Sequence, residues 1–392
     1  MSFQVIAVRA LHATASQMGV LTAFETVPYL VLGLFIGVLV DHTSNRRLLI
    51  GSDLARLVVL VGASYLAVSG RINIQIMWAV VCVISTFNLV FDAALGAYVP
   101  KVLARSQWLR ANSRLSATQS GSEVAGPGLA GYMLQAISAP AVMLIDGVTY
   151  GVSAMCILVG KPNQPGGVSG GRELDKNPIV PPEVRMNVWL SMRQGASFVF
   201  RHRILRIFAI WTAVWNFSWS AVLAVFVLYA THILMMSPGS IGLAVAVGGI
   251  GGILGSSMAG RLAKRWSRGR VLVFAPLIGA SGGALLFAAR GARALIVVAD
   301  AMLFYSLGEG AFGVNIQTCR QELTPANLMG RMDTTMRVCF RGMASLGALA
   351  GGLVGSKFGL RAAILAGVCG LFVTVVGLYC SGLADLVGDA ND

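Results

Sequence analysis

The sequence predicts an all-α polytopic membrane protein, and three observations carry this prediction. Of the 392 residues, 56% are hydrophobic and only 12% are charged, and the mean hydropathy of +0.74 lies above the usual range of soluble proteins. The 47 glycines allow apolar helices to pack backbone against backbone in lipid. Most Lys and Arg residues lie in short loops between long apolar runs. The formal net charge of +14 therefore indicates membrane topology, and we expect no nucleic-acid partner.

A helix needs about 20 apolar residues to cross the hydrocarbon core of a bilayer. Eleven runs of that length occur, at 18–40, 48–69, 73–99, 116–137, 140–160, 204–230, 239–260, 271–289, 293–318, 338–356 and 361–383. An earlier apolar stretch, from Phe3 to Val8, is interrupted by Arg9 and is too short to cross. It also lacks the charged start and long apolar core of a signal peptide. We therefore expect about 11 full spans.

The distribution of basic residues predicts the orientation of these spans. One set of alternate loops holds 23 of the 30 Lys and Arg residues, including the whole stretch from Lys161 to Arg206. The opposite loops hold five, which are Arg71, Arg290, Arg293, Lys357 and Arg361. Loops rich in Lys and Arg remain in the cytoplasm. The richer side and the tail after Gly382 are thus expected to be cytoplasmic, in the bacterial cytoplasmic (inner) membrane.

Residues 161–203 divide the chain. Residues 161–182 are rich in Pro and Gly and predict a flexible cytoplasmic linker, and an amphipathic segment follows at 188–203. This predicts an N-terminal helix bundle over 1–160 and a C-terminal bundle over 204–392. The sequence GVLVD at 37–41, with Arg47, also aligns with GRLAK at 260–264, with Arg270, at an offset of 223 residues. Repeated halves are common in secondary transporters, whose substrate path runs between them.

Several of these runs resemble known motifs. GVLVD at 37–41, followed by Arg46 and Arg47, resembles the loop between helices 2 and 3 of the major facilitator superfamily, with departures at positions 42, 44 and 45. GPGLAG at 126–131 resembles the Gly-Pro signature of helix 5 in the antiporter branch, with Ala130 in place of a usual Gly. The resemblance implies a major facilitator fold of two six-helix bundles. Symport and antiport share this fold, so the transport direction stays open.

Further motifs resemble one subgroup of that superfamily, the macrolide-efflux and enterobactin-exporter-like proteins. They are RQELTP at 320–325, GRM at 330–332, Arg337, RG at 341–342, FD at 91–92, ANS at 111–113 and DG at 146–147. The resemblance covers nearly the whole chain and implies twelve helices with both termini in the cytoplasm. Residues 1–8 then look like the tail of a first helix that is largely missing, through a misassigned start or a truncation.

A charged group near the first predicted loop is the gating candidate. Its members are Asp41, Arg46, Arg47, Asp53 and Arg56. The positive-inside rule explains the two arginines of the loop, but not Asp41, nor Asp53 and Arg56 at helical i, i+3 spacing. A carboxylate there can also face the positive end of a helix. We expect a network that locks the cytoplasmic side in one state, and the alternative is an ordinary basic loop.

Five carboxylic acids lie within apolar runs and are the proton-coupling candidates. They are Glu25, Glu123, Asp92, Asp146 and Glu309. An ionisable group in a span is costly unless it faces a cavity or a partner. Glu25 and Glu123 are closest to mid-span and each lies near a proline, whereas Asp92 and Asp146 could instead cap helix ends or bond to other helices.

Tryptophans at every fourth position suggest a substrate cavity. Trp211, Trp215 and Trp219, with Asn216 beside them, would share one helical face suited to a flat apolar compound. Such a stripe more often faces lipid or a neighbouring helix. Ladders of small residues at four-residue spacing predict packing seams instead, at Gly248, Gly252, Ser256 and Gly260 and at Gly347, Gly351 and Gly355.

Other functional classes have no visible site. No GxxxxGK[ST], H-E-x-x-H or G-x-S-x-G motif occurs, so neither ATP hydrolysis nor a catalytic residue is expected. The six Cys lack CxxC spacing and the four His are isolated, which predicts no metal site. We expect a monomeric exporter of a small amphipathic drug, antibiotic or siderophore, driven by protons without a cofactor. The alternatives are a truncated remnant without transport activity and a membrane enzyme without a recognisable motif.

Overall fold

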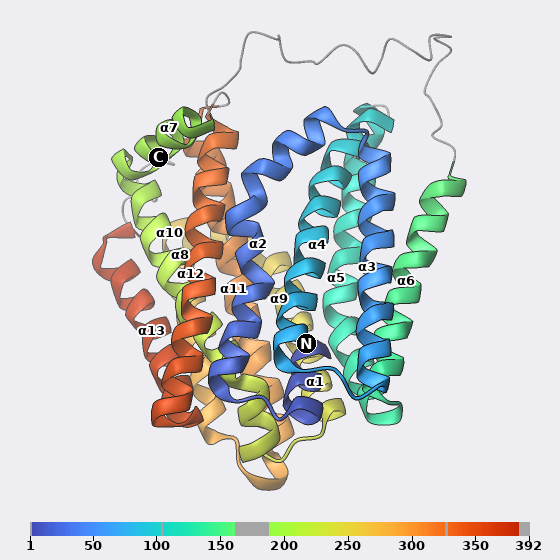
Figure 1. Cartoon of the computed structure of the whole chain (residues 1–392). Coiled ribbons are helices and arrows are strands. Elements are labelled where there is room, and N and C mark those ends of the chain that lie inside the picture. The colour runs from blue at the N-terminus through green and yellow to red at the C-terminus, as the bar shows by residue number, and fades with distance from the viewer. Residues whose placement is uncertain (1, 103–104, 161–187, 326–327, 384–392) are drawn as a thin grey trace, which may run out of the picture.

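A computed structural model describes residues 2–102, 105–160, 188–325 and 328–383, and this part of the chain is helical without strands (Figure 1). The N-terminal half consists of α1 (Ser2–Leu11), α2 (Ala15–His42), α3 (Asn45–Val68), α4 (Ile74–Val102), α5 (Arg105–Ala136) and α6 (Ala139–Val159). A connecting helix, α7 (Val188–Arg201), precedes the C-terminal half. That half consists of α8 (Arg203–Leu228) with a π-helical turn (Tyr229–Ile233), α9 (Pro238–Trp266), α10 (Arg268–Leu285), α11 (Ala294–Leu323), α12 (Met329–Phe358) and α13 (Leu360–Cys380).

The long helices coincide with the predicted apolar runs. For example, the run at 73–99 corresponds to α4, and the run at 361–383 corresponds to α13. Nine helices of the described residues are long and apolar enough to cross a membrane. With ten residues, α1 extends over about 15 Å, roughly half the hydrocarbon thickness. A multi-pass membrane protein is therefore confirmed, while 11 spans remain a prediction. The predicted linker at 161–182 lies outside the described residues.

Local signals in the sequence set the helix ends. The α2 N-terminus has a capping box. The backbone N–H of Gln17 donates to the Thr14 hydroxyl, and the backbone N–H of Thr14 donates to the side-chain oxygen of Gln17. Helices α12 and α13 are separated by Gly359 alone, whose φ of +91° favours glycine. Ser44 and Ser267 occupy the N-cap positions of α3 and α10 and lie 223 residues apart. The sequence offset between the halves thus corresponds to the same helix junction in each.

Glycines bring helices together within the C-terminal half. Gly347 and Gly351 of α12 face the backbone of α8, and a Cβ at Gly355 would lie 3.0 Å from a Val225 methyl group. These contacts confirm the predicted packing seam at 347–355. The other predicted ladder is only partly right, because Gly248 contacts Met302 whereas Gly260 faces open space.

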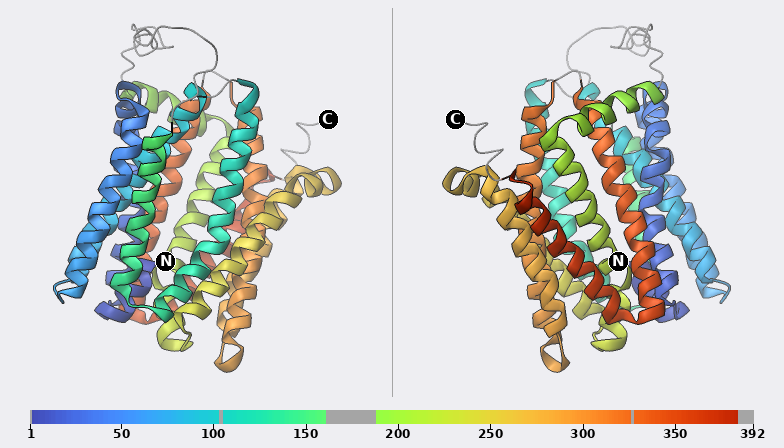
Figure 2. Two further views of the ribbon diagram at one scale, coloured as in Figure 1. Left: turned by 90° about the vertical axis from the view of Figure 1, so that its right-hand side faces the viewer. Right: turned by 90° about the vertical axis from the view of Figure 1, so that its left-hand side faces the viewer.

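The two halves meet along two helix pairs, α2 with α12 and α5 with α9. We call the membrane side at which α6 ends and α7 begins the linker side. The closest backbone contacts between the halves through described glycines lie toward the opposite side: Gly19 faces Ala348 and Gly352, and Gly131 faces Gly242. Nearer the linker side, a Cβ at Gly342 of α12 would lie 3.3 Å from a Leu30 methyl group of α2, whereas a Cβ at Gly33 of α2 would meet nothing within 4 Å. Figure 2 shows α5 and α9 converging away from the linker side and separating toward it.

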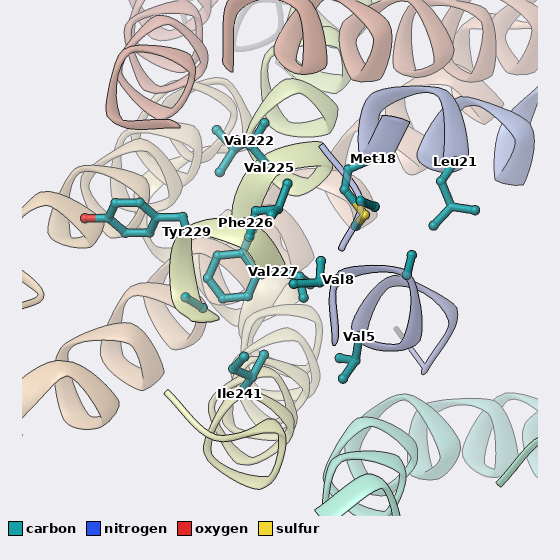
Figure 3. Close-up of a cluster of buried hydrophobic side chains, with 14 of the residues drawn as sticks. Val5, Val8, Met18, Leu21, Val222, Val225, Phe226, Val227, Tyr229 and Ile241 are labelled. Atoms are coloured by element: carbon teal, nitrogen blue, oxygen red, sulfur yellow. The ribbon is translucent and has the colours of Figure 1, made fainter. Parts of the chain in front are cut away.

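A large hydrophobic cluster fills the opposite side between the halves (Figure 3). It contains Val5 and Val8 of α1 and Met18 of α2, together with Val225 and Phe226 of α8, all buried. Since lipid is as apolar as these side chains, close packing holds them together here. The cluster and the glycine contacts together close the opposite side.

Candidate transport site and charged clusters

The centre of the N-terminal half holds a buried arginine. Arg56 of α3 is 4% exposed, forms an ion pair with Asp53, which is 1% exposed, and donates a 2.6 Å hydrogen bond from Nη1 to Asn88 Oδ1 of α4. Its guanidinium also lies 4.7 Å from the Phe91 ring centroid and 4.2 Å from that of Tyr150 in α6. Such cation–π contacts are strongest where the charge is desolvated. One side chain therefore joins α3 to both α4 and α6.

The five predicted gating residues do not form a single group. Arg46 donates to three carbonyls at the α6 C-terminus, with its shortest bond, from Nη2 to Leu158 O, at 2.8 Å. It thereby satisfies backbone groups that a helix end leaves open. Arg47 is exposed, and the side chain of Asp41 lies outside the described residues. Arg46 and Arg56 belong to separate contacts, because ten residues of helix separate them by about 15 Å along the axis. A gating role of these residues stays a prediction.

A second set of ion pairs lies at the linker-side ends of the C-terminal helices. Arg320 of α11 is 5% exposed and contacts Asp333 of α12 at 2.5 Å, and Arg337 reaches the other Asp333 oxygen at 3.3 Å. Arg268 of α10 pairs with Glu322 of α11. These pairs tie three helix ends together. In the sequence, Arg320 and Arg337 belong only to motifs of the resemblance. The pairing of Arg320 with Asp333 could not be predicted, because the two residues are 13 positions apart and belong to different helices.

Asp92 of α4 is the predicted coupling residue that interacts with charged groups of both halves. It is exposed, and its carboxylate interacts with the charges of Arg56 and Arg341 and with the Tyr29 hydroxyl. The Arg341 guanidinium of α12 lies 4.8 Å from the Tyr29 ring centroid of α2. Three helices, two from one half and one from the other, thus supply the surroundings of this acid.

The other four predicted acids are dispersed. Glu25 is half-buried on α2, one helical turn before Tyr29. Asp146 of α6 is exposed and interacts with the Arg56 charge. Glu309 belongs to the other half and interacts with Tyr305 of α11. Although Glu123 lies in α5, its side chain is outside the described residues.

The tryptophan stripe packs against other helices of the C-terminal half. Trp215 is 2% exposed, and its ring lies parallel to that of Tyr305 at 5.7 Å between centroids. Trp219 stacks on the same tyrosine at 3.4 Å. Trp211 lines a 690 Å³ apolar groove between α8 and α13, and Asn216 donates a bond to Thr212 O of its own helix. This arrangement matches the alternative expectation, contact with neighbouring helices, rather than a cavity between the halves.

Among the described residues, no group of three or more His, Cys, Asp or Glu side chains is placed to hold a metal ion. The arrangement is instead that of two helical halves with a contact closed on one side. A family model described as the Major Facilitator Superfamily matches residues 1–348. The chain belongs to the Major Facilitator Superfamily. This family comprises membrane transporters of small molecules and is not a class of enzymes.

Relatives agree with this membership. The chain is 23% identical over 372 residues to an uncharacterized MFS-type transporter, YfiS, of Bacillus subtilis strain 168, covering 94% of this chain and 84% of the relative. A crystal structure of a mutant of the nucleoside transporter NupG is similar with a TM-score of 0.74 at 10% identity, covering 97% of this chain and 94% of that one. The crystal structure of a bacterial homologue of the iron transporter ferroportin, in an inward-facing state, is similar with a TM-score of 0.71 at 12% identity. The match covers 97% of this chain and 93% of that chain. At these identities the likeness to solved structures shows the fold alone.

Proposed function

We propose that this transporter exports a small amphipathic compound in exchange for protons by alternating access. The observation that supports this proposal most is the asymmetric contact between the halves, which glycine seams and a hydrophobic cluster close on the side opposite to α7. A rocking motion about this contact would expose a central site to each membrane side in turn. The export direction and the amphipathic substrate, a drug, antibiotic or siderophore, rest on the resemblance to the macrolide-efflux and enterobactin-exporter-like proteins. A bacterial inner membrane and a cytoplasmic linker side are part of the proposal.

In this proposal all 11 helices of 18 or more residues cross the bilayer. The two ion-paired regions act as rigid parts of the moving halves. Arg46 fixes the end of α6 to the N-terminal half, and the Arg320–Asp333–Arg337 group fixes α11 to α12. Gating then depends on how the ends of α2 and α12, including Asp41, approach one another when the linker side closes.

Asp92 is the coupling residue that we favour among the five acids. In its ionised form the carboxylate attracts Arg341 of the other half, and a proton bound to a carboxylate oxygen removes that attraction. Protonation from one side of the membrane would thus loosen the contact between the halves, and release of the proton would restore it. Glu25, one turn from Tyr29 on α2, is the second candidate. Glu123, Asp146 and Glu309 follow.

Transport by everted membrane vesicles tests the coupling role. Ethidium and erythromycin serve as amphipathic probes, with an imposed pH gradient of either sign. We expect Asp92→Asn to abolish gradient-driven uptake but to keep downhill exchange, because the amide mimics the protonated acid. Asp300→Asn, which changes another exposed acid within a span, is the matched control and should retain uptake. Unimpaired gradient-driven uptake by Asp92→Asn would remove Asp92 from the mechanism, and the test moves to Glu25→Gln.

Orientation is tested separately by cysteine labelling of intact cells in a variant without the six native cysteines. Arg47 and Arg71 are both exposed, but they lie at opposite ends of α3. We expect Arg71→Cys to react with an impermeant maleimide and Arg47→Cys to react only after the cells are permeabilised. The reverse pattern would place the linker side outside the cell.

A further inference from the structure

A pocket of 720 Å³ lies on the linker side, between α7 and the start of α12. Its polar lining comes from Arg193, Gln194, Ser197, Arg201, His202 and Arg331. Arg193, Ser197 and Arg201 follow each other at four-residue spacing, so they occupy one face of α7. The pocket is lined by three arginines and by no acidic side chain.

Two polar groups in this pocket are arranged in a way that favours an anion. The Arg331 guanidinium donates to Gln194 Oε1, which leaves the Gln194 amide nitrogen as a donor. His202 Nδ1 is buried and has no hydrogen-bond partner among the described residues. His202 is also the N-cap residue of α8, and its side chain makes no capping bond. The partial positive charge of that helix end therefore adds to the arginines.

The pocket is built on a rigid contact. A Cβ at Gly195 of α7 would lie 2.5 Å from Arg331 O and 2.7 Å from Thr335 Oγ1 of α12. Only a glycine allows this approach, which holds α7 against α12. The same helix, α12, contacts α2 of the other half, where the hydroxyls of Ser345 and Thr26 lie 2.6 Å apart. A ligand held between α7 and α12 would therefore contact a helix that also forms the contact between the halves.

We propose that this pocket binds a phosphate group, either the headgroup of an anionic phospholipid or a free phosphate compound. Arginine forks match the oxygens of a phosphate, and basic pockets beside membrane helices bind anionic headgroups. Helix α7 crosses the linker-side ends of the helices (Figure 1). The pocket between α7 and α12 therefore lies at the level expected for lipid headgroups. The bound phosphate offsets part of the positive charge of the three arginines and stabilises the contact of α7 with α12.

The test is binding to the purified, delipidated full chain. The probes are cardiolipin in detergent, phosphatidylcholine as the neutral lipid, and inorganic pyrophosphate without lipid, and the readouts are native mass spectrometry and the melting temperature. We expect the unmodified chain to retain one anion. For R193Q/R201Q we expect the affinity for the anion to fall by about 10-fold or more. The variant R261Q/R265Q removes equal charge from exposed arginines of α9 and should bind as the unmodified chain does.

The arms separate the two sources of phosphate. Binding of cardiolipin without any effect of pyrophosphate identifies a lipid headgroup, whereas stabilisation by pyrophosphate alone identifies a free phosphate compound. If R193Q/R201Q fails to fold, the single Arg193→Gln variant replaces it. Equal anion binding by the unmodified chain, the pocket variant and the α9 variant would overturn the proposal, as would equal binding of cardiolipin and phosphatidylcholine.

Discussion

The two halves of the protein share a helix order but stabilise their centres by different chemistry. In the N-terminal half, Arg56 and Asp53 form a buried ion pair beneath two aromatic rings. In the C-terminal half, Tyr305 stacks between the rings of Trp215 and Trp219. The buried arginine is tolerated in the first case because Asp53 of its own helix pairs with it and groups of α4 and α6 surround it. The comparison teaches that a repeated fold fixes where helices lie without fixing which interactions hold them.

The halves also differ in the helix that begins them. Helix α8 extends over 26 residues and packs on both α12 and α13. At the corresponding place in the other half, α1 has ten residues and contacts α4 and α5 only near the opposite side. Helix α6 packs mainly on α3, with Gly147 and Gly151 against Leu57, whereas α13 packs on α8, α10 and α12. The contacts of α3 are therefore central to the N-terminal half.

The largest effect should follow from breaking the ion pair of that half. Arg56→Met leaves the Asp53 carboxylate buried without a partner, because its second oxygen, Oδ2, already lacks one among the described residues. We expect a loss of about 3–5 kcal/mol in stability, measured by thermal unfolding in detergent. The double variant R56M/D53N should recover most of it, and Arg47→Met, at an exposed position, should have no effect. An unchanged melting temperature for Arg56→Met would contradict the role of the pair.

A smaller effect is expected in the C-terminal half. Tyr305→Leu keeps an apolar side chain but removes two ring contacts, each worth about 0.5–1.5 kcal/mol. The expected loss of about 1–3 kcal/mol is measured in the same unfolding assay. Tyr305→Phe keeps both stacks and serves as the control. Equal stability of the leucine and phenylalanine variants would show that burial alone, and not stacking, matters at this position.

The smallest effect concerns the seam between the halves. A Cβ at Gly19 would lie 2.7 Å from Ala348 O, so Gly19→Ala should weaken the closed opposite side by about 1–2 kcal/mol. Spin labels at Arg47 and Arg265 should then report a larger population with the linker side closed. Gly33→Ala, on the same helix but facing open space, is the matched control. If both alanine variants give the distances of the unmodified chain, the seam does not set the conformational equilibrium.

Much of the fold was predictable because its signals are local. Apolar runs of membrane-spanning length placed every long helix, since the bilayer demands about 20 apolar residues for each crossing. The glycine seam at 347–355 followed from four-residue spacing on one helix face. The candidate site was harder to predict from the sequence. The sequence put Arg46 and Arg56 into one group because they are close along the chain, but the helix between them separates the two roles.

The sequence by itself determined the membrane class, the approximate position of each long helix and the bias of basic residues toward one side, because each depends on composition or on spacing within one helix. Only the tertiary structure decided which distant residues meet. It paired Arg320 with Asp333, brought Arg341 of one half onto Tyr29 of the other, and turned Trp215 toward Tyr305. It also decided that the halves close on the side opposite to α7. The physical reason is that helix rotation and helix partners depend on packing among many side chains at once, which no single segment encodes.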